Sequence, residues 1–118
     1  MPSLSTHVLD LHHGTPAQNV KIEVFHQQDG EPFELIKTVV TNKDGRCDEQ
    51  IVTHESWKQG TYELVFHVAD YYKEKSVTLP TPNFLTTVPI RFNMTESASH
   101  YHVPLLVTPW GYQIYRGS

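Results

Sequence analysis

Cysteine is almost absent from this chain of 118 residues, which contains only Cys47. One cysteine cannot form an intrachain disulfide, so the disulfide scaffolds typical of small secreted domains are excluded. The chain also lacks a basic N-terminal region followed by an apolar stretch, the pattern of a secretion signal. We therefore expect a reducing compartment. The cytoplasm is the first expectation, and the periplasm and the peroxisome stay open as alternatives.

Positive charge is scarce as well. Nine Lys and Arg residues stand against thirteen Asp and Glu residues, which gives a net charge of −4 at pH 7. Without a basic field, the chain has little attraction for phosphate backbones or anionic membrane surfaces. No apolar run is long enough to cross a bilayer. The sequence therefore argues against both nucleic-acid and membrane partners.

The hydrophobic pattern that is present repeats every second residue, which is typical of half-buried strands. Turn dipeptides such as Asp29-Gly30 and Asp44-Gly45 separate the runs. The chain length suits one compact core, so residues 1–118 are predicted to form a single domain. One helix of about two turns is expected at residues 69–75. Eight short strands are expected, at residues 5–10, 20–26, 33–40, 50–52, 61–68, 88–92, 102–107 and 111–115. This spacing predicts an all-β sandwich or barrel.

The histidines are the first candidates for chemistry, since there are eight of them. His7 lies within a predicted strand, where a histidine is often held by a backbone carbonyl and has no further role. His100 and His102 are two residues apart, so both project from one strand face. Together with His7, or with the His12 and His13 pair, they could bind zinc, but no sharp metal-ligand spacing accompanies them. A metal site is therefore not expected.

Two further residues have competing interpretations. Arg46 follows the Asp44-Gly45 turn, where a solvated cation is the ordinary interpretation and anion binding is the functional one. Cys47, beside it, could be a nucleophile, but no nucleophile signature surrounds it. A lone cysteine in such a position is usually a small buried hydrophobic residue.

Four motifs in combination resemble one family, the transthyretin-related 5-hydroxyisourate hydrolases. The resemblance covers nearly the whole chain, and the C-terminal Tyr-Arg-Gly-Ser is its most specific element, because it separates these hydrolases from the transthyretins. The motifs are Leu4-Ser5-Thr6-His7-Val8-Leu9-Asp10 with Gly14-Thr15-Pro16-Ala17, Thr41-Asn42-Lys43-Asp44-Gly45-Arg46, His100-Tyr101-His102-Val103-Pro104-Leu105-Leu106, and Tyr112 with Tyr115-Arg116-Gly117-Ser118.

The resemblance implies a prealbumin-like, or transthyretin-like, sandwich of two four-stranded sheets. It also implies a homotetramer, assembled as a dimer of dimers, whose central channel holds the active sites. Its implied activity opens the ring of 5-hydroxyisourate to a ureidoimidazoline in urate degradation to allantoin, with no metal or organic cofactor. The implied catalytic residues are His7, Arg46, His102 and Ser118. The implied substrate-binding residues are His7, Arg46, Tyr115, Arg116 and Gly117.

The sequence departs from the family pattern just before its end. The family commonly reads Ser-Pro-x-x-Tyr-Ser-Thr-Tyr-Arg-Gly-Ser, whereas Gln113 and Ile114, which are bulkier, precede Tyr115 here. If Gln113 faces the channel, substrate fit or packing between dimers is altered.

These residues suggest a hydrolytic mechanism, and two other functions compete with it. Hydrolysis of a cyclic acyl carbon needs an activated water, and either His102 or His7 could be the general base, with Arg46 binding the anion. A transthyretin-like carrier of small ligands would have the same fold but no chemistry. However, buried histidine, arginine and polar termini are unfavourable in a purely apolar channel. A monomeric sandwich for adhesion or carbohydrate contact is the third possibility.

Overall fold

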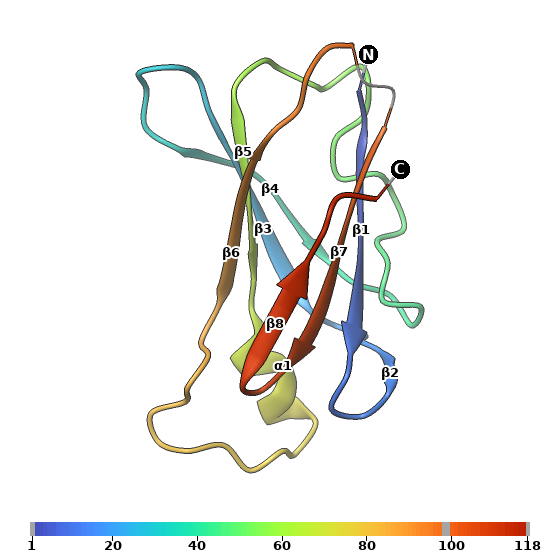
Figure 1. The fold of residues 1–118 in the computed structure, drawn as a ribbon, viewed down its shortest axis with the longest axis vertical. Helices are drawn as coiled ribbons and strands as arrows, with labels where there is room; N and C mark the ends of the chain where they lie inside the picture. Colours follow the sequence, from blue (N-terminus) through green and yellow to red (C-terminus); the bar gives the residue numbers. More distant parts are fainter. Residues whose placement is uncertain (1, 98–99, 118) are drawn as a thin grey trace.

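A computed structural model describes residues 2–97 and 100–117 as two β-sheets packed face to face, with one short helix at one end (Figure 1). The first sheet has the strand order β2-β1-β7-β8 and the second has the order β4-β3-β5-β6. The elements are β1 (Leu4–Asp10), β2 (Thr15–Pro16), β3 (Lys21–Gln27), β4 (Glu34–Val40), β5 (Thr61–Phe66), α1 (Val68–Glu74), β6 (Val88–Asn93), β7 (Tyr101–Thr108) and β8 (Gly111–Ile114).

The pairing of β1 with β7 joins the two ends of the chain. These strands run parallel over seven consecutive residue pairs, from Leu4 opposite Tyr101 to Asp10 opposite Val107. All the other strand pairs in both sheets are antiparallel. The all-β architecture predicted from the strand pattern is therefore confirmed, as is the sandwich of two four-stranded sheets that the family resemblance implies.

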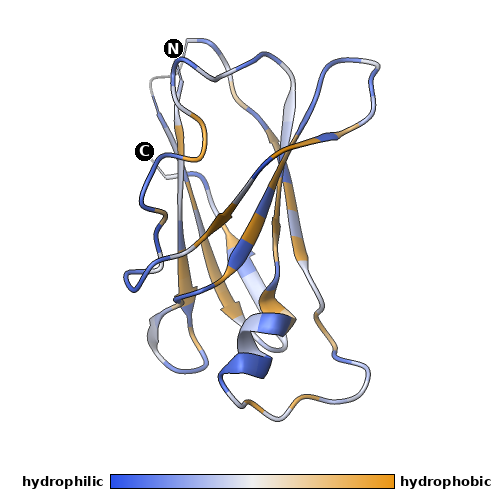
Figure 2. Cartoon of the chain, turned by 180° about the vertical axis from the view of Figure 1, so that it is seen from behind, coloured by the Kyte–Doolittle hydropathy of each residue, from blue (hydrophilic) through white to orange (hydrophobic). Residues whose placement is uncertain are grey.

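Alternating burial explains why these segments form strands. β1 and β5 bury every second side chain between the sheets and leave the others on the outer faces. In Figure 2 apolar and polar residues alternate along the strands, and much of α1 is polar. Inward-facing side chains such as Val8, Ile22, Leu64, Phe66 and Leu105 have no exposed surface. This packing supplies most of the hydrophobic stabilisation of the fold.

The structure corrects three of the predicted elements. Residues 50–52 do not form a strand, because Val52 makes a single bridge to Leu4 while Ile51 and Val52 fill the core. The short strand β2 was not predicted, since its two residues have no alternation to detect. The predicted strand at 61–68 ends at Phe66, and Val68 instead begins α1.

Within the described residues, no helix is long and apolar enough to span a membrane.

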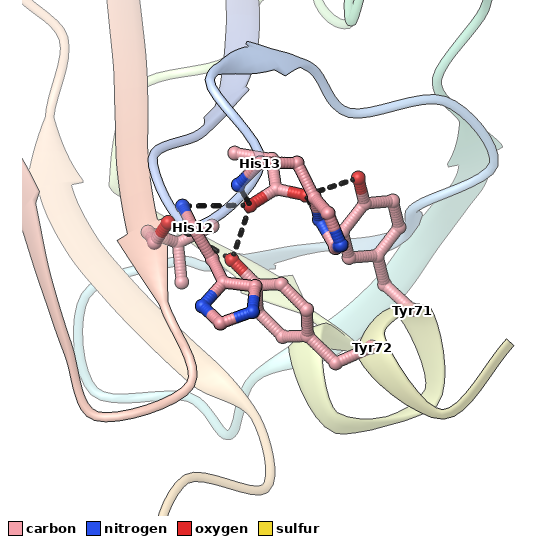
Figure 3. A network of polar contacts seen from close by, with 6 residues as sticks. His12, His13, Tyr71 and Tyr72 are labelled. Atoms are coloured by element: carbon pink, nitrogen blue, oxygen red, sulfur yellow. Dashed lines mark hydrogen bonds and ion pairs between the residues drawn. The ribbon is translucent and has the colours of Figure 1, made fainter. Parts of the chain in front are cut away.

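A buried carboxylate fixes the end of β1 against α1. Asp10 is 1% exposed and accepts hydrogen bonds from the hydroxyls of Tyr71 (2.7 Å) and Tyr72 (2.8 Å). It also accepts the backbone N–H groups of His12 and His13. In Figure 3 the two tyrosine rings project from α1 toward the turn that carries these histidines. The contacts join β1, the following turn and α1 through one charged group.

These contacts also set the ionisation of the cluster. Burial by itself raises the pKa of the Asp10 carboxyl, but hydrogen bonds from Tyr71, His13 and Tyr72 together hold that pKa below its ordinary value. Burial and the bond to Asp10 raise the pKa of both tyrosine hydroxyls. Near neutral pH, Asp10 is therefore ionised and both tyrosine hydroxyls are protonated and donate to it.

The Asp10→Asn substitution tests this network, because it keeps the side-chain size and removes the charge. Hydrogen bonds to charged groups contribute about 1.5–3 kcal/mol each, so the free energy of unfolding at pH 7 should fall by about 2–4 kcal/mol. Urea denaturation measures this. As a graded control, Tyr71→Phe removes one hydrogen bond to the charged carboxylate and should lower stability by about 1.5 kcal/mol.

Comparison of the parent with the Asp10→Asn variant also tests how the stability contributed by this network depends on pH. Because the pKa of Asp10 is lowered in the folded chain, its stabilisation is present above the unfolded pKa and is lost as the pH falls through the folded pKa. The Asp10→Asn variant should lose less stability on acidification than the parent. Equal losses would contradict this role of the carboxylate.

Candidate active site

The outer face of the first sheet brings the two motif histidines together. The alternation in β1 turns Ser5, His7 and Leu9 away from the core. In the parallel register, Ser5 lies opposite His102 and His7 lies opposite Pro104. Side chains of directly paired residues lie on the same face of a sheet. His7 and His102 are therefore diagonal neighbours on one surface, from strands nearly a hundred residues apart in sequence.

Arg46 reaches this face along the other side of β1. The side chain of Asn42 closes the preceding turn by accepting the N–H groups of Asp44 and Arg46. Gly45 has φ +75°, and a Cβ atom there would lie 2.4 Å from the carbonyl oxygen of Val8. Only glycine therefore allows the turn to approach β1 so closely. The approach pairs Arg46 directly with His7 in an isolated antiparallel bridge.

Among the described residues, His7 is hydrogen-bonded through one ring nitrogen. Its Nε2 lies 2.9 Å from the carbonyl oxygen of Asp44, and because a carbonyl can only accept, Nε2 carries the proton. This is the contact expected of a structural histidine, but it leaves Nδ1 able to accept another hydrogen bond. Partial burial and the nearby Arg46 guanidinium lower the pKa of His7. The ring is therefore mostly neutral at pH 7.

His102 is held from the opposite nitrogen. The hydroxyl of Ser5 lies 2.8 Å from its Nδ1, so Nε2 is the nitrogen available to other partners. Partial burial lowers the pKa of His102, and the charges of Arg46, His7 and His100 lower it further. A neutral imidazole with one accessible nitrogen can accept a proton from water.

The C-terminal segment lies beside His102. Gly117 donates its N–H to the His102 carbonyl oxygen at 2.6 Å, and it accepts the His102 N–H at 3.4 Å. Arg116 instead places its guanidinium 4.3 Å from the ring centre of Tyr101, an inward-facing residue of β7. Arg116 is thus directed to the opposite face of β7 from His102. It lines a cavity with Tyr115 and residues 90–93. Ser118 lies outside the described residues.

The two bulky departures from the family pattern face different sides. Gln113 pairs with Leu106 on β7, which places it on the same outer face as His102. Ile114 pairs with Leu105 and packs against the core. Gln113 is therefore the one of the two that extends toward the candidate site.

Sequence reasoning missed the partners of His102. Ser5 bonds to His102 and also to His100 Nε2, at 3.0 Å, although neither Ser5 nor His100 was predicted as a site residue. The alternation in Ser5-Thr6-His7 and His100-Tyr101-His102 places all four polar side chains outward, but only the parallel pairing of β1 with β7 shows that they meet. Among the described residues, no group of three or more His, Cys, Asp or Glu side chains is placed to hold a metal ion.

The arrangement can support hydrolysis without a metal. Two largely neutral imidazoles provide proton acceptors, and the Arg46 guanidinium provides a fixed positive charge for a developing oxyanion. These groups come from three adjacent backbone segments, the 42–46 turn, β1 and β7, and the C-terminal segment lies beside β7.

Comparison with known sequences identifies a family. The profile of the HIUase/Transthyretin family matches residues 4–117. The 5-hydroxyisourate hydrolase of Pseudomonas aeruginosa is 48% identical over 118 residues, covering 100% of this chain and 93% of the relative. The 5-hydroxyisourate hydrolase 2 of Rhizobium meliloti is 50% identical over 115 residues, covering 98% of this chain and 95% of the relative.

Comparison with solved structures gives the same fold. The 5-hydroxyisourate hydrolase of Klebsiella pneumoniae superposes with a TM-score of 0.79 and 30% identity, covering 100% of both chains. Sea bream transthyretin in complex with thyroxine superposes with a TM-score of 0.86 and 25% identity, covering 98% of this chain and 94% of that chain.

The influence of Arg46 on both histidines can be measured directly. In the Arg46→Gln variant the pKa values of His7 and His102 should both rise, because the cationic neighbour is gone, although burial still holds them below the ordinary value. NMR titration of the histidine rings measures the shift. Lys43→Gln removes the same charge from an exposed position in the same turn and should leave both values in place. Unchanged values in Arg46→Gln would contradict the assigned electrostatics.

Proposed function

The chain belongs to the HIUase/transthyretin family, and from this premise we propose that the face carrying His7, Arg46 and His102 is its catalytic site. The chain is a 5-hydroxyisourate hydrolase. It opens the ring of 5-hydroxyisourate to 2-oxo-4-hydroxy-4-carboxy-5-ureidoimidazoline in urate degradation. The observation that supports the site is the meeting of two pKa-lowered histidines with an arginine on one sheet face.

His102 is the proposed general base. Ser5 occupies its Nδ1, so Nε2 faces outward and takes a proton from the water that attacks the cyclic acyl carbon. Arg46 stabilises the oxyanion that forms. When the carbon–nitrogen bond breaks, a proton goes to the leaving nitrogen. His7, whose Nε2 is fixed by Asp44, orients the substrate or its water through Nδ1.

The C-terminal segment completes the proposed substrate site. Gly117 lies beside the His102 backbone at the catalytic face. In this proposal Ser118 contributes its hydroxyl or carboxylate to catalysis, while Tyr115 and Gly117 contact the substrate. Arg116, held on Tyr101, contributes by anchoring the segment that contacts the substrate.

A carrier without chemistry is the competing function within this fold. The similarity to sea bream transthyretin gives this alternative its basis. The outer face described here is poorly suited to it, because an arginine and two histidines would have to be desolvated beside an apolar ligand. The high identity to hydrolases over the full chain favours the enzyme.

We also propose a homotetramer built as a dimer of dimers, located in the cytoplasm as the single cysteine suggests. His7 and His102 lie on the outer face of their sheet, and in this proposal a second subunit encloses the substrate against that face. Strands β4, β6 and β8 are sheet edges, which soluble proteins usually cover. Exposed apolar side chains near β8, Trp110, Tyr112 and Tyr115, provide contact surface for a second copy.

The activity is tested with 5-hydroxyisourate made in situ from urate and urate oxidase, by following its ultraviolet decay. His102→Ala should lower kcat/KM by about 10²–10⁴, the usual contribution of a general base. Arg46→Ala should lower it by about 10²–10³ through loss of oxyanion stabilisation. His54→Gln, at an exposed histidine outside this face, serves as the matched control and should retain parental activity.

Two outcomes of this assay are decisive. If the parent leaves the spontaneous decay unchanged, the chain has the fold without the hydrolase activity, and the carrier function is favoured. If His102→Ala keeps parental activity, the assignment of the base is wrong.

One residue added after Ser118 tests the role of the chain end in the same assay. It should lower kcat/KM about tenfold, a change of about 1.4 kcal/mol.

Assembly is tested by sedimentation velocity. The chain should sediment as one species of about four times the 13.6 kDa chain mass. Trp110→Glu places a charge on the exposed apolar surface and should yield smaller species, whereas Lys73→Glu on the exposed side of α1 should not. A monomeric parent would exclude the shared channel.

A further inference from the structure

Serine and histidine side chains alternate in a hydrogen-bonded row behind His102. The hydroxyl of Ser3 lies 2.6 Å from His100 Nδ1. The hydroxyl of Ser5 lies 3.0 Å from His100 Nε2 and 2.8 Å from His102 Nδ1. The backbone fixes this row, since Tyr101 donates its N–H to the Ser3 carbonyl oxygen at 2.8 Å and Ser5 pairs with His102. The four polar groups therefore form one continuous chain.

Each member of this row can both donate and accept. A serine hydroxyl carries one proton and two lone pairs, and a neutral imidazole has one donor and one acceptor nitrogen. The row therefore has two orientations. In one, His102 Nδ1 donates to Ser5, Ser5 donates to His100 Nε2, and His100 Nδ1 donates to Ser3. In the other, every bond is reversed. Moving one proton along the row converts the first orientation into the second.

The row leads from the catalytic face to solvent. Solvent reaches the row at His100, which is half-buried, whereas Ser3 is buried and its hydroxyl accepts a hydrogen bond at 3.5 Å from the exposed Gln50. His102 lies at the inner end, where Arg46 and His7 are its charged and titratable neighbours besides His100. A cation next to His102 disfavours keeping a second positive charge on its ring. A proton taken up there is thus driven away from Arg46.

Hydrolysis of this substrate releases a proton that must leave the site. The attacking water supplies one oxygen and two protons. The oxygen becomes part of a new carboxyl group, one proton goes to the leaving ureido nitrogen, and the second is freed because the carboxyl group is ionised at neutral pH. A ureido nitrogen is not basic enough to take up the second proton. One proton per turnover therefore needs a path to solvent.

We propose that Ser5 and His100 are positioning residues that carry this proton from His102 to solvent, an inference that rests on the proposed function. His102 Nε2 takes the proton from water, and its Nδ1 proton passes to the Ser5 oxygen. The Ser5 proton moves to His100 Nε2, and the His100 Nδ1 proton leaves through Ser3 or solvent. After the product leaves, His102 Nε2 gives its proton to water in the emptied site, and the row takes up one proton from solvent at the Ser3 end, which restores the starting orientation with one proton released per turnover. No bond other than those to hydrogen changes.

The proposal is tested by His100→Gln and Ser5→Ala, assayed by 5-hydroxyisourate decay in dilute and in concentrated imidazole buffer. Both variants should lose about tenfold in kcat in dilute buffer, with little change in KM. Concentrated imidazole should restore His100→Gln toward the parental rate, because free imidazole can carry the proton. Ser5→Thr keeps the hydroxyl and should retain activity. His54→Gln is the control histidine variant and should respond like the parent in both buffers.

A second measurement needs no substrate. Nitrogen-15 NMR of the histidine rings reports which His102 nitrogen carries the proton, and Ser5→Ala should change this distribution while Ser5→Thr should not. The outcomes separate the two proposals. A parent without hydrolase activity overturns the proposed function. An active parent whose His100→Gln and Ser5→Ala variants keep parental kcat in dilute buffer overturns the relay, as does a loss that imidazole fails to restore.

Discussion

The parallel pairing of β1 with β7 is the constraint on which the site depends. It aligns the outward row of β1, which includes Ser5 and His7, with the row of β7 that contains His102. Because side chains alternate between faces, a slip of one residue would place His7 opposite an inward-facing position of β7. The same pairing keeps Val8 and Leu105 together in the core. Core packing and catalytic alignment are therefore set by one register.

The alternation of apolar and polar residues predicted most of the fold, because the buried side chains follow every second position along the strands. β1, β3 and β5 could be recognised from alternation alone, and the helix expected at residues 69–75 is present as α1. Residues 50–52 were misassigned because two consecutive buried side chains, Ile51 and Val52, look like a strand when read locally. The strand β2 is too short for any period to appear. Both differences arise from tertiary contacts with β1.

The candidate site was predictable only in part. Resemblance to a family gave His7, Arg46 and His102, and alternation gave the faces of the two histidines. Neither could show that Ser5 and His100 bond to each other, because that contact joins residues 95 apart in the sequence. The position of Arg116 against Tyr101 was equally inaccessible, since it depends on where the last residues cross β7. These contacts depend on the register between strands far apart in the sequence, which local sequence patterns do not determine.

Gly45 illustrates how a residue without a functional group can govern chemistry. Its backbone oxygen accepts the Val8 N–H at 2.8 Å, and its missing side chain lets the turn lie against β1. Any larger residue would push the turn outward and carry the Arg46 guanidinium away from both histidines, while the core on the other side of β1 stays packed. In a survey of random mutations, changes at this position would thus be classified with those of the catalytic residues, as losses of activity in a protein that still folds.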